Sequence, residues 1–454
     1  MEALEMGAHR SPHAEPPRML IVGMGVTGLA CARHLVALGH EVRLTDSRRH
    51  PPALAALREV VPESHLSTGR FDTALLDEAD QVIVSPGVSL DEPLVRAARA
   101  RGLGVTGDIE LFAASAQAPV IAITGSNGKS TVTSLVAALL VAGGAEVRAG
   151  GNLGMPALAL LGDSEPDFYV LELSSFQLER TMSLRTRAAT VLNVSSDHLD
   201  RYPSIEAYAA VKATIYERCE VPVYNRGEQA LPLRDQGISF GLDVAAAGHY
   251  GIVTDSRGTR YLARGDERLL AADALKLVGD HNVTNALAAL ALADAAGCEP
   301  GGVLDALAGF PGLPHRCTPI AERGGVTWVD DSKGTNIGAA IAAVRGLARP
   351  IVLIAGGLAK GADFGPLAAA LRGRARAAVL IGRDAERIAD ALAGVCPLVR
   401  ADDMQQAVVH ASRIARGGDV VLLSPACASQ DMFPDYRARG TAFAAAVRAL
   451  DHDS

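Results

Sequence analysis

One short loop constrains the fold of this chain more than any other feature of its sequence. Residues 124–131 read Thr-Gly-Ser-Asn-Gly-Lys-Ser-Thr, between an apolar run that ends at Thr124 and a helix-like segment over 130–142. Backbone N–H groups in such a loop, with a helix N-terminus behind them, can wrap a polyphosphate. Lys129 would reach the β- and γ-phosphates, and the hydroxyl of Ser130 would ligate Mg²⁺. The loop therefore predicts a parallel α/β sheet that binds a polyphosphate at its edge.

A second glycine pattern, near the start of the chain, predicts another nucleotide site. Residues 23–28 read Gly-Met-Gly-Val-Thr-Gly, between a predicted strand over 19–22 and a predicted helix over 28–38. This is the dinucleotide fingerprint, and Asp46 ends the next predicted strand, where its carboxylate could bind a ribose hydroxyl. The pattern favours a nucleotide or a nucleotide-sugar as ligand, and by itself it does not indicate NAD.

Apolar runs and helix-like segments alternate in three blocks. The predicted strands are 19–22, 42–45 and 82–84, then 120–124, 169–173 and 190–194, and finally 326–329, 351–355, 378–381 and 420–423. Residues 310–319, with three prolines and a glycine, are interpreted as a linker, and 227–275 show short β-like runs without recognisable chemistry. The sequence predicts an α/β fold of three domains. These are an N-terminal Rossmann-like domain over 18–112, a central P-loop domain with a parallel mononucleotide-binding sheet over 113–312, and a C-terminal Rossmann-like α/β domain over 313–454, after a disordered tail over 1–17.

Charge and composition narrow the classes of partner. The 454 residues include 43 Lys and Arg against 51 Asp and Glu, a net charge of −8, and only 4% are aromatic. Such a chain lacks the positive field and the stacking surfaces of a nucleic-acid binder. The first 17 residues hold no apolar run, the longest apolar stretches are too short to cross a bilayer, and no two of the 6 cysteines form a CxxC pair. We therefore expect a cytoplasmic protein with reduced thiols and with neither a nucleic-acid nor a membrane partner.

Acidic and basic side chains in the central block point to chemistry beside the loop. Glu172 ends a predicted strand, and Asp197 and His198 follow another, so all three are expected at the loop's edge of the sheet as ligands for phosphate-bound Mg²⁺. Lys212 falls on the apolar stripe of a helix that Ser204 would cap. An unpaired ammonium is costly there, so Lys212 must snorkel, pair, lose its proton or be modified.

The remaining candidates lie further along the chain. Asn282 and Asn285 are one helical turn apart and could bracket an adenine or ribose, or simply cap the helix that they open. Arg316 lies in the predicted linker. Polar loops follow three predicted strands of the last block, at 330–336, 356–364 and 423–429, and their Lys333 and Lys360 suit an anionic substrate.

Taken together, these motifs resemble those of the Mur ligase family. Residues 124–131, 171–175, 193–200, 281–285, 313–316, 331–336 and 424–429 match the family's motifs in the family's order, and the resemblance runs from about Arg18 to the C-terminus. Ile123 stands where the general P-loop pattern has its first glycine, and the family's loop has this shorter form. The resemblance implies an ATP-dependent ligase that adds D-glutamate to UDP-N-acetylmuramoyl-L-alanine through an acyl phosphate. Such an enzyme releases ADP and phosphate in peptidoglycan precursor synthesis, and we expect a monomer.

The resemblance also implies roles residue by residue. For the UDP-substrate it implies Gly25, Val26, Thr27, Asp46, Ser47, Arg48, Gly87 and Asn152. For ATP it implies Gly125, Ser126, Asn127, Gly128, Lys129, Ser130, Thr131, Asn282, Asn285, Arg316 and Asp331. For the amino acid it implies Lys333, Thr335, Lys360, Ser429 and Tyr436. Two Mg²⁺ ions would be held by Ser130, Glu172, His198 and a carboxylated Lys212, and Lys129, His198 and Lys212 would be catalytic.

Three other interpretations stay open at this point. The first is another Mur-type ligase or a folylpolyglutamate ligase, although the loops at 331–333 and 360–364 favour D-glutamate and the chain has no Asn-Pro-Arg loop of the diamino-acid enzymes. The second is an NAD-dependent dehydrogenase that uses residues 23–28. The third is a nucleotide-binding module without catalysis, which the combination of Lys129, Glu172 and His198 argues against.

Overall fold

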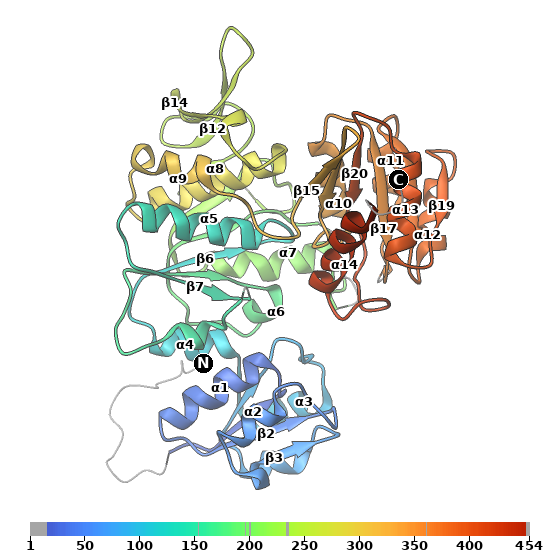
Figure 1. Ribbon diagram of the computed structural model, residues 1–454. Helices are drawn as coiled ribbons and strands as arrows, with labels where there is room; N and C mark the ends of the chain where they lie inside the picture. Colours follow the sequence, from blue (N-terminus) through green and yellow to red (C-terminus); the bar gives the residue numbers. More distant parts are fainter. Residues whose placement is uncertain are drawn as a thin grey trace.

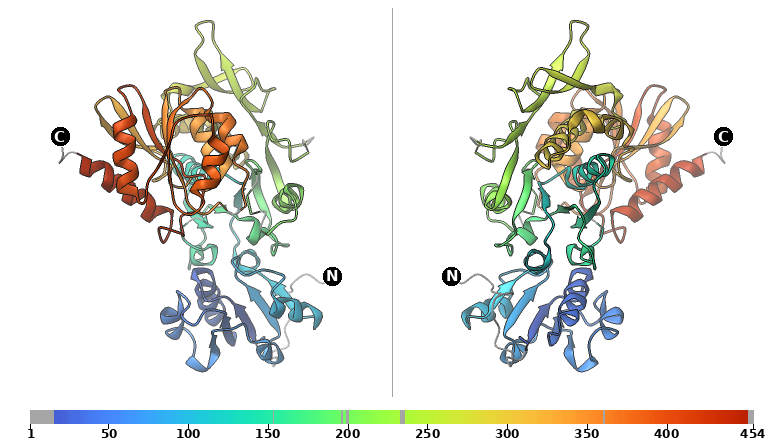
Figure 2. Two further views of the ribbon diagram at one scale, coloured as in Figure 1. Left: turned by 90° about the vertical axis from the view of Figure 1, so that its right-hand side faces the viewer. Right: turned by 90° about the vertical axis from the view of Figure 1, so that its left-hand side faces the viewer.

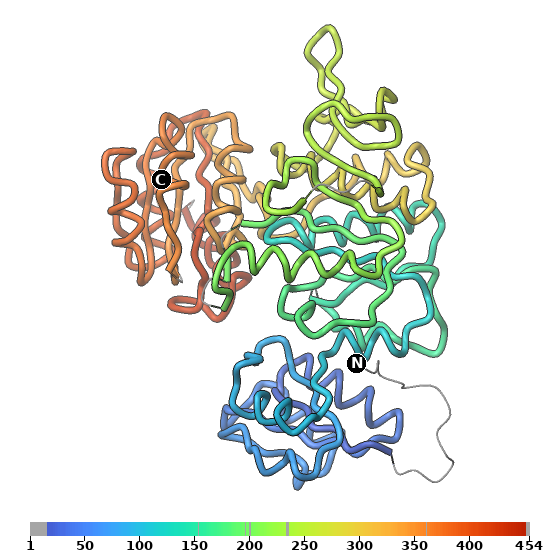
Figure 3. Tube along the Cα trace, turned by 180° about the vertical axis from the view of Figure 1, so that it is seen from behind, coloured from blue at the N-terminus to red at the C-terminus, as the bar shows by residue number. Residues whose placement is uncertain are grey.

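The computed structural model describes residues 16–152, 154–195, 197–198, 201–232, 236–359 and 361–450. These residues form three sheets with helices packed against them, arranged with the N-terminal sheet below the central one and the C-terminal sheet beside it (Figure 1). The same arrangement is seen from the two sides in Figure 2 and from behind in Figure 3. The predicted α/β class is thereby confirmed. The predicted tail over 1–17 lies almost wholly outside the described residues.

The N-terminal sheet has five parallel strands in the order β3-β2-β1-β4-β5. Its central strand β1 is buried at all four positions, which is why it appears in the sequence as an uninterrupted apolar run. The strands are β1 (Met19–Val22), β2 (Val42–Asp46), β3 (Leu66–Thr68), β4 (Gln81–Val84) and β5 (Gly104–Thr106), and the helices that follow them are α1 (Val26–Ala37), α2 (Leu54–Arg58), α3 (Pro93–Ala100) and α4 (Asp108–Ser115).

The central sheet has nine strands in the order β14-β13-β12-β11-β10-β9-β6-β8-β7. Strands β6 to β12 pair in parallel, and β13 and β14 add an antiparallel extension. The bounds are β6 (Val120–Thr124), β7 (Val147–Gly151), β8 (Phe168–Glu172), β9 (Thr186–Val191), β10 (Cys219–Asn225), β11 (Ile238–Phe240), β12 (Tyr250–Thr254), β13 (Arg260–Arg264) and β14 (Glu267–Ala271). The helices are α5 (Lys129–Ala142), α6 (Ser175–Leu178), α7 (Ile205–Ala213), α8 (Asp280–Ala295) and α9 (Leu304–Gly309).

Helices α5 and α8 pack side by side on one face of the central sheet (Figure 1). Residues 286–293 of α8 are all alanine or leucine and all buried, and they share a core with Leu135, Val136 and Leu139 of α5. Small alanine side chains let two helices approach each other closely over the sheet. The N-terminus of α5, and with it the loop at 125–128, is thereby fixed at the carboxyl edge of the sheet.

The C-terminal sheet has six strands in the order β15-β16-β20-β17-β18-β19, of which only β15 is antiparallel to its neighbour. The strands are β15 (Thr318–Arg323), β16 (Val326–Asp330), β17 (Ile351–Gly356), β18 (Ala375–Ile381), β19 (Leu398–Arg400) and β20 (Val420–Leu423). One face packs against α10 (Ile337–Gly346), α11 (Gly365–Leu371) and α12 (Ala385–Leu392), and the other against α13 (Met404–Ile414) and α14 (Tyr436–Ala449). Short 3₁₀ turns lie at Glu63–His65, Thr73–Glu78, Ala157–Leu160, Thr214–Tyr216, Ala272–Ala274 and Pro300–Val303.

The predicted linker and one predicted domain boundary differ from the structure. The predicted linker over 310–319 ends inside β15, because an edge strand tolerates Pro319 and a register irregularity follows it. Residues 227–275 contribute β11 to β14 and so belong to the central sheet. The predicted domain boundary at 112/113 falls within α4, and the domain boundaries stay predictions. Among the described residues, no helix has the length and apolarity to span a membrane.

Candidate active site

The predicted phosphate loop connects β6 to α5, and two of its glycines are required by its geometry. Gly125 and Gly128 have φ angles of +148° and +84°, which side chains rarely allow. A Cβ on Gly128 would also lie 2.5 Å from Oδ1 of Asn285. The loop thus presses its backbone against α8, and the backbone N–H groups at the start of α5 stay accessible to an anion.

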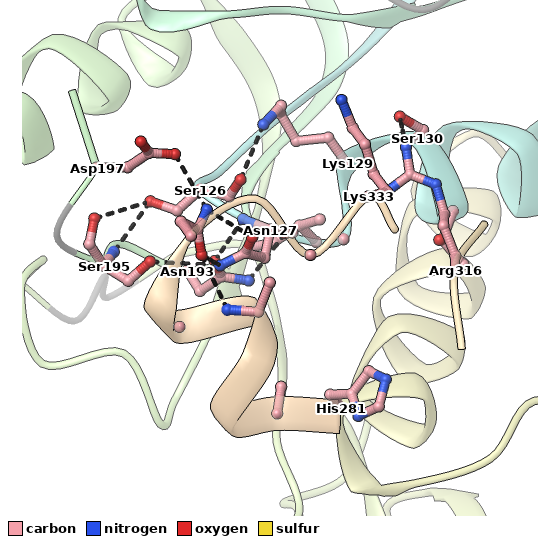
Figure 4. Close-up of a pocket in the computed structure, with 18 of the residues that line it drawn as sticks. Ser126, Asn127, Lys129, Ser130, Asn193, Ser195, Asp197, His281, Arg316 and Lys333 are labelled. Carbon is pink, nitrogen blue, oxygen red and sulfur yellow. Dashed lines mark hydrogen bonds between the residues drawn. The ribbon is translucent and has the colours of Figure 1, made fainter. Parts of the chain in front are cut away.

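Lys129 lies across this loop. Its Nζ donates to the carbonyl oxygen of Gly125 at 2.9 Å. It also donates to the carbonyl oxygen of Ser126 at 3.0 Å (Figure 4). Burial lowers the pKa of Lys129, and the carboxylates of Glu172 and Asp197 partly oppose that shift. The next residue, Ser130, accepts a hydrogen bond on its Oγ from Nη2 of Arg316 at 2.6 Å. The loop is therefore linked directly to the segment that leads into the C-terminal sheet.

A cavity of about 600 Å³ opens over the loop. The ends of strands in the central sheet form one side of it, and the C-terminal sheet contributes the other. From the predicted sites it is lined by Ser126, Asn127, Gly128, Lys129, Ser130, Thr131, Asn152, Glu172, His198, Lys212, Asn282, Asn285, Arg316, Asp331, Lys333 and Thr335. Gly125 does not line the cavity, but its carbonyl oxygen accepts the hydrogen bond from Nζ of Lys129. Lys360 lies outside the described residues.

Three cations converge on this cavity. Lys129, Arg316 and Lys333 lie on the same side of the loop (Figure 4). The pKa of Lys333 is lowered to about 8, chiefly by burial and in part by the nearby charges of Arg316 and Lys129. Burial also lowers the pKa of the Arg316 guanidinium. Such crowding of positive charge is costly without an anion, so the cavity suits a highly charged ligand such as a triphosphate.

Glu172 provides an anionic oxygen for a cation. The residue is 3% exposed, its Oε1 accepts from Nδ2 of Asn152 at 2.6 Å, and its Oε2 has no hydrogen-bond partner among the described residues. A buried carboxylate oxygen without a donor is unfavourable unless a cation binds it. Across the described ranges, no group of three or more His, Cys, Asp and Glu could hold a metal. Because Mg²⁺ is commonly held by one or two carboxylates together with substrate phosphates and water, the residues fit Mg²⁺ carried by a phosphate chain.

Lys212 is buried beneath the same loop. Ser204 caps α7 as expected, since its Oγ accepts from the Ala207 N–H, and the helix places Lys212 at 1% exposure. Its Nζ donates to the Gly125 carbonyl at 2.9 Å and lies 4.4 Å from the centroid of the Tyr208 ring. Burial lowers the pKa of Lys212 well below its usual value, and the nearby Lys129 lowers it further. Snorkelling is thus excluded, because the amine is buried and is paired with a backbone carbonyl and an aromatic ring.

Other predicted residues of this site have defined surroundings. His198 has a φ of +56°, and its ring packs edge-on against Phe176 with centroids 4.8 Å apart. Asn282 and Asn285 do not cap α8; Asn282 Nδ2 donates to the Val278 carbonyl, and Asn285 Nδ2 donates to Asn282 Oδ1 at 3.2 Å. Both residues lie near the start of α8 and line the cavity wall.

The predicted amino-acid residues are only partly brought together. Lys333 Nζ lies 4.3 Å from the centroid of the Tyr436 ring, and Thr335 lines the cavity. Neither Tyr436 nor the buried Ser429 lies on the cavity wall. The assignment of these two residues to the amino acid stays a prediction.

A second cavity of about 730 Å³ lies between the N-terminal sheet and the central one. All residues predicted for the UDP-substrate line it: Gly25, Val26, Thr27, Asp46, Ser47, Arg48, Gly87 and Asn152. Asn152 lines both cavities, so the two spaces meet at this side chain. The pair of cavities is therefore suited to one extended ligand next to a second, polyphosphate ligand.

The fingerprint alone suggests that the Asp46 carboxylate binds a ribose. In the structure, however, both carboxylate oxygens already accept hydrogen bonds from protein groups, so Asp46 is not available to a ribose. Its Oδ2 accepts from the Met24 N–H and Arg48 Nη2, each at 2.7 Å, and its Oδ1 accepts from the backbone N–H and Nε of Arg48, each at 2.9 Å. Burial by itself would raise the pKa of Asp46, but the hydrogen bonds from Arg48 and Met24 outweigh burial and keep the pKa below its usual value. Asp46 thus orients Arg48 toward the cavity.

Several cavity residues received no role from the sequence, and three of them have notable surroundings. His281 has a buried Nδ1 without a hydrogen-bond partner among the described residues, and burial lowers the pKa of its ring to about 4. Asn336 bonds to both Asn127 and Asp197. His281 and Asn336 lie within motifs that are visible in the sequence, at 281–285 and 331–336. Arg437, which reaches the second cavity from α14, follows no pattern and could be found only from the structure.

The chain is similar to proteins of one family over nearly its whole length. Residues 17–107 match the Mur ligase MurD-like N-terminal domain, 123–293 the Mur ligase middle domain, and 315–427 the Mur ligase glutamate ligase domain. It is 52% identical over 437 residues to a UDP-N-acetylmuramoylalanine–D-glutamate ligase of Nitrosococcus oceani, which covers 95% of this chain and 96% of that protein.

Solved structures share the fold. The UDP-N-acetylmuramate–alanine ligase of Thermotoga maritima is 20% identical, with a TM-score of 0.62 over 96% of this chain and 100% of that one. The MurF ligase of the same organism, solved in complex with ADP, is 17% identical, with a TM-score of 0.59 over 83% of this chain and 92% of that one.

Proposed function

The chain belongs to the Mur ligase family, and from this premise we propose that it joins D-glutamate to UDP-N-acetylmuramoyl-L-alanine with ATP as the energy source. It is an ATP-dependent ligase of peptidoglycan synthesis. The junction of the two cavities at Asn152 carries this proposal. A substrate that binds through its uridine end in the second cavity can direct its other end past Asn152 toward the phosphate loop.

The reaction needs an activated carboxylate, since a free carboxylate is a poor electrophile. An oxygen of the alanyl carboxylate attacks the γ-phosphorus of ATP, the bond to the β-phosphate oxygen breaks, and an acyl phosphate and ADP form. The amine of D-glutamate then attacks the acyl carbon, inorganic phosphate leaves, and the amine loses a proton as the amide forms. Both steps bring anions together, so the cluster of Lys129, Arg316 and Lys333 stabilises the charge that develops.

The remaining predicted residues are assigned by their place on the two cavities. Residues 126–131, Asn282, Asn285, Arg316 and Asp331 line the first cavity and hold the nucleotide, with Gly125 in the same loop, and Lys333 and Thr335 receive the amino acid. Mg²⁺, as two ions, would be held by Ser130, Glu172, His198 and a carboxylated Lys212, and when bound it would neutralise charge on the phosphates. The enzyme is a cytoplasmic monomer that acts on small molecules, and a single species of about 47 kDa in light scattering is expected.

A substrate panel tests the proposal. We expect phosphate release from ATP only when UDP-N-acetylmuramoyl-L-alanine and D-glutamate are both present, with the dipeptide-linked product confirmed by mass. The panel replaces D-glutamate with L-alanine, L-glutamate or diaminopimelate, and a folate substrate replaces the UDP-sugar. Substantial turnover with one of these replacements would move the chain to another branch of the family. NAD(H) binding without phosphate release would contradict the ligase altogether, and the occupied carboxylate of Asp46 already disfavours a nicotinamide dinucleotide.

A further inference from the structure

A single backbone carbonyl of the UDP-side loop accepts hydrogen bonds from two arginines of the central sheet region. The loop is residues 85–89, all of which line the second cavity. The carbonyl oxygen of Val88 accepts from Nη2 of Arg180 at 2.5 Å and from Nη2 of Arg201 at 3.2 Å. Guanidinium hydrogen bonds are strong and directional, so this carbonyl is held firmly.

Arg180 is an unusual residue to bury at this place. Its side chain is 1% exposed, Nη1 donates to the Phe176 carbonyl, and Nε has no hydrogen-bond partner among the described residues. The nearest carboxylate contact is Glu179 Oε2, 3.9 Å from Nη1. Burial lowers the pKa of Arg180 to about 10, and the group therefore stays charged near neutral pH. Burial of a charge whose partners are mainly two carbonyl oxygens costs free energy. Because Arg180 bonds to both, it holds the carbonyls of Phe176 and Val88 together.

The segment before Arg180 connects the two cavities. Residues 174–176 line the first cavity and Gln177 lines the second. Gln177 also donates from Nε2 to Asp108 Oδ2 at 2.9 Å, at the start of α4. A Cβ on Gly107 would lie 3.1 Å from Cβ of Arg180, so the chain segment that joins the two sheets packs against the stem of this arginine. Arg180 thus occupies the place where the N-terminal sheet, α6 and the UDP-side loop meet.

We infer that Arg180 is a positioning residue for the UDP-linked substrate. It holds loop 85–89 at a fixed separation from the phosphate loop, so that a substrate anchored in the second cavity reaches the first with its carboxylate. Arg201 shares the Val88 carbonyl and supports the same loop. The inference rests on the proposed function, because it assigns the second cavity to the UDP end.

The test compares variants at the two arginines with a matched control. Arg180→Met removes both carbonyl bonds, Arg180→Lys can restore one, and Arg201→Met removes the second bond to Val88 together with the contacts of Arg201 with Glu179 and the Phe176 ring. Arg187→Met is the control, because the Nε of Arg187 also donates to a carbonyl, that of Ala295, far from the loop. The readouts are KM for each of the three substrates, kcat, the thermal midpoint, and calorimetric binding of UDP-N-acetylmuramoyl-L-alanine alone.

We expect Arg180→Met to weaken binding of the UDP-substrate by about tenfold or more, as the loss of charged hydrogen bonds implies. KM for ATP and for D-glutamate should stay within about twofold. Arg180→Lys should recover part of the loss, and Arg201→Met should show a smaller loss of the same kind. Arg187→Met should leave all three KM values unchanged.

Equal effects on the three substrates, or unchanged binding of the UDP-substrate in folded Arg180→Met, would overturn the inference. If Arg180→Met does not fold, Arg201→Met decides the question. The side chain of Arg201 is 19% exposed, so its removal leaves fewer buried polar groups without a partner. Failure of the wild-type protein to bind the UDP-substrate at all would instead contradict the proposed function.

Discussion

Two lysines share one acceptor beneath the phosphate loop. Nζ of Lys129 and Nζ of Lys212 each donate to the carbonyl oxygen of Gly125 at 2.9 Å. Two ammonium groups this close repel each other, and burial lowers the pKa of both. A neutral Lys212 amine relieves the repulsion and can add to CO₂, with loss of a proton, to give a carbamate anion. We propose that Lys212 is carboxylated in this way, which would turn a repulsive neighbour of Lys129 into an attractive one and would offer an oxygen ligand to Mg²⁺.

This argument predicts the behaviour of Lys212→Ala. Without the carbamate, phosphate release should fall by about 10²-fold or more, the scale expected for the loss of one electrostatic group at a reacting phosphate. Added formate or acetate should restore part of the rate, because a short carboxylate fits the space that the side chain leaves. The exposed Lys276→Ala is the control and should keep full activity. A fully active Lys212→Ala would refute the role.

Asp331 predicts a pH dependence of stability. Its Oδ2 accepts from the Ser424 hydroxyl at 2.6 Å, and burial raises its pKa from 3.8 to about 7. Because the folded state then binds the proton more tightly than the unfolded state, this stabilisation is complete below about pH 4 and is lost as the pH rises through about 7. Within that window the contribution to the unfolding free energy falls by about 1.4 kcal/mol per pH unit.

The measurement is urea unfolding of the wild type and Asp331→Asn from pH 4.5 to 7.5. The amide does not titrate, so the wild type should lose stability relative to the variant as the pH rises. Parallel curves for the two proteins would show that Asp331 has an ordinary pKa in the folded protein.

At the scale of the element, the turn from β6 into α5 depends on one glycine. Gly128 combines a φ of +84° with the contact to Asn285 described above. Gly128→Ala should cost about 1–2 kcal/mol of stability through the left-handed backbone. It should also raise KM for ATP by about tenfold or more, because displacement of the loop misplaces the phosphates.

Gly39→Ala separates these two effects. Gly39 follows α1 with a φ of +82°, and a Cβ there would meet no atom within 4 Å. It should lose similar stability, measured by thermal unfolding, and keep its KM for ATP. If both variants bind ATP equally well, the contact with Asn285 does not matter.

Single strands, helices and loops also show which parts of the structure can be predicted from the sequence. Buried parallel strands such as β1 and β6 stand out as apolar runs, and the glycines and Lys129 locate the phosphate loop, because these features are local. Strand β15 escaped detection because it contains Pro319 and is only partly buried. Helix α6 has four residues, too few for a hydrophobic period, so nothing predicted that Arg180 would reach Val88. The burial of Lys212 was visible on its helical stripe, whereas its acceptor depends on tertiary packing.

At the scale of the whole molecule, the three sheets are joined at the edges that carry the cavities. The Val88 carbonyl, next to the N-terminal sheet, accepts a hydrogen bond from Arg180 of the central region. From the region of the C-terminal sheet, Arg316 donates to Ser130 and Asn336 donates to Asn127 of the phosphate loop. A reaction of three substrates gains from such joining, because each sheet contributes one binding surface and the entropic cost of bringing the substrates together is met by binding. The contacts between sheets therefore belong to the active site as much as the residues that touch the substrates.

Asn336 provides the last prediction, because it has two separable tasks. Its Oδ1 accepts from the Ala339 N–H at 2.9 Å, which caps α10, and also from Asn127 Nδ2 at 3.3 Å, whereas its Nδ2 donates to Asn127 Oδ1 at 3.1 Å and to Asp197 Oδ2 at 3.0 Å. Asn336→Ser keeps a good helix cap and loses the reach to the phosphate loop, whereas Asn336→Ala loses both and should be less stable by about 1 kcal/mol.

The cap of α13, Asp403, accepts from the Gln406 N–H at 2.7 Å, so Asp403→Ser is a cap exchange without a contact to another sheet. If the contact between sheets assembles the site, Asn336→Ser should be nearly as stable as the wild type yet raise KM for ATP and D-glutamate several-fold, whereas Asp403→Ser should leave both values unchanged. Should Asn336→Ser match the wild type in every KM, the hydrogen bonds between Asn336 and the central sheet region would be an incidental consequence of packing.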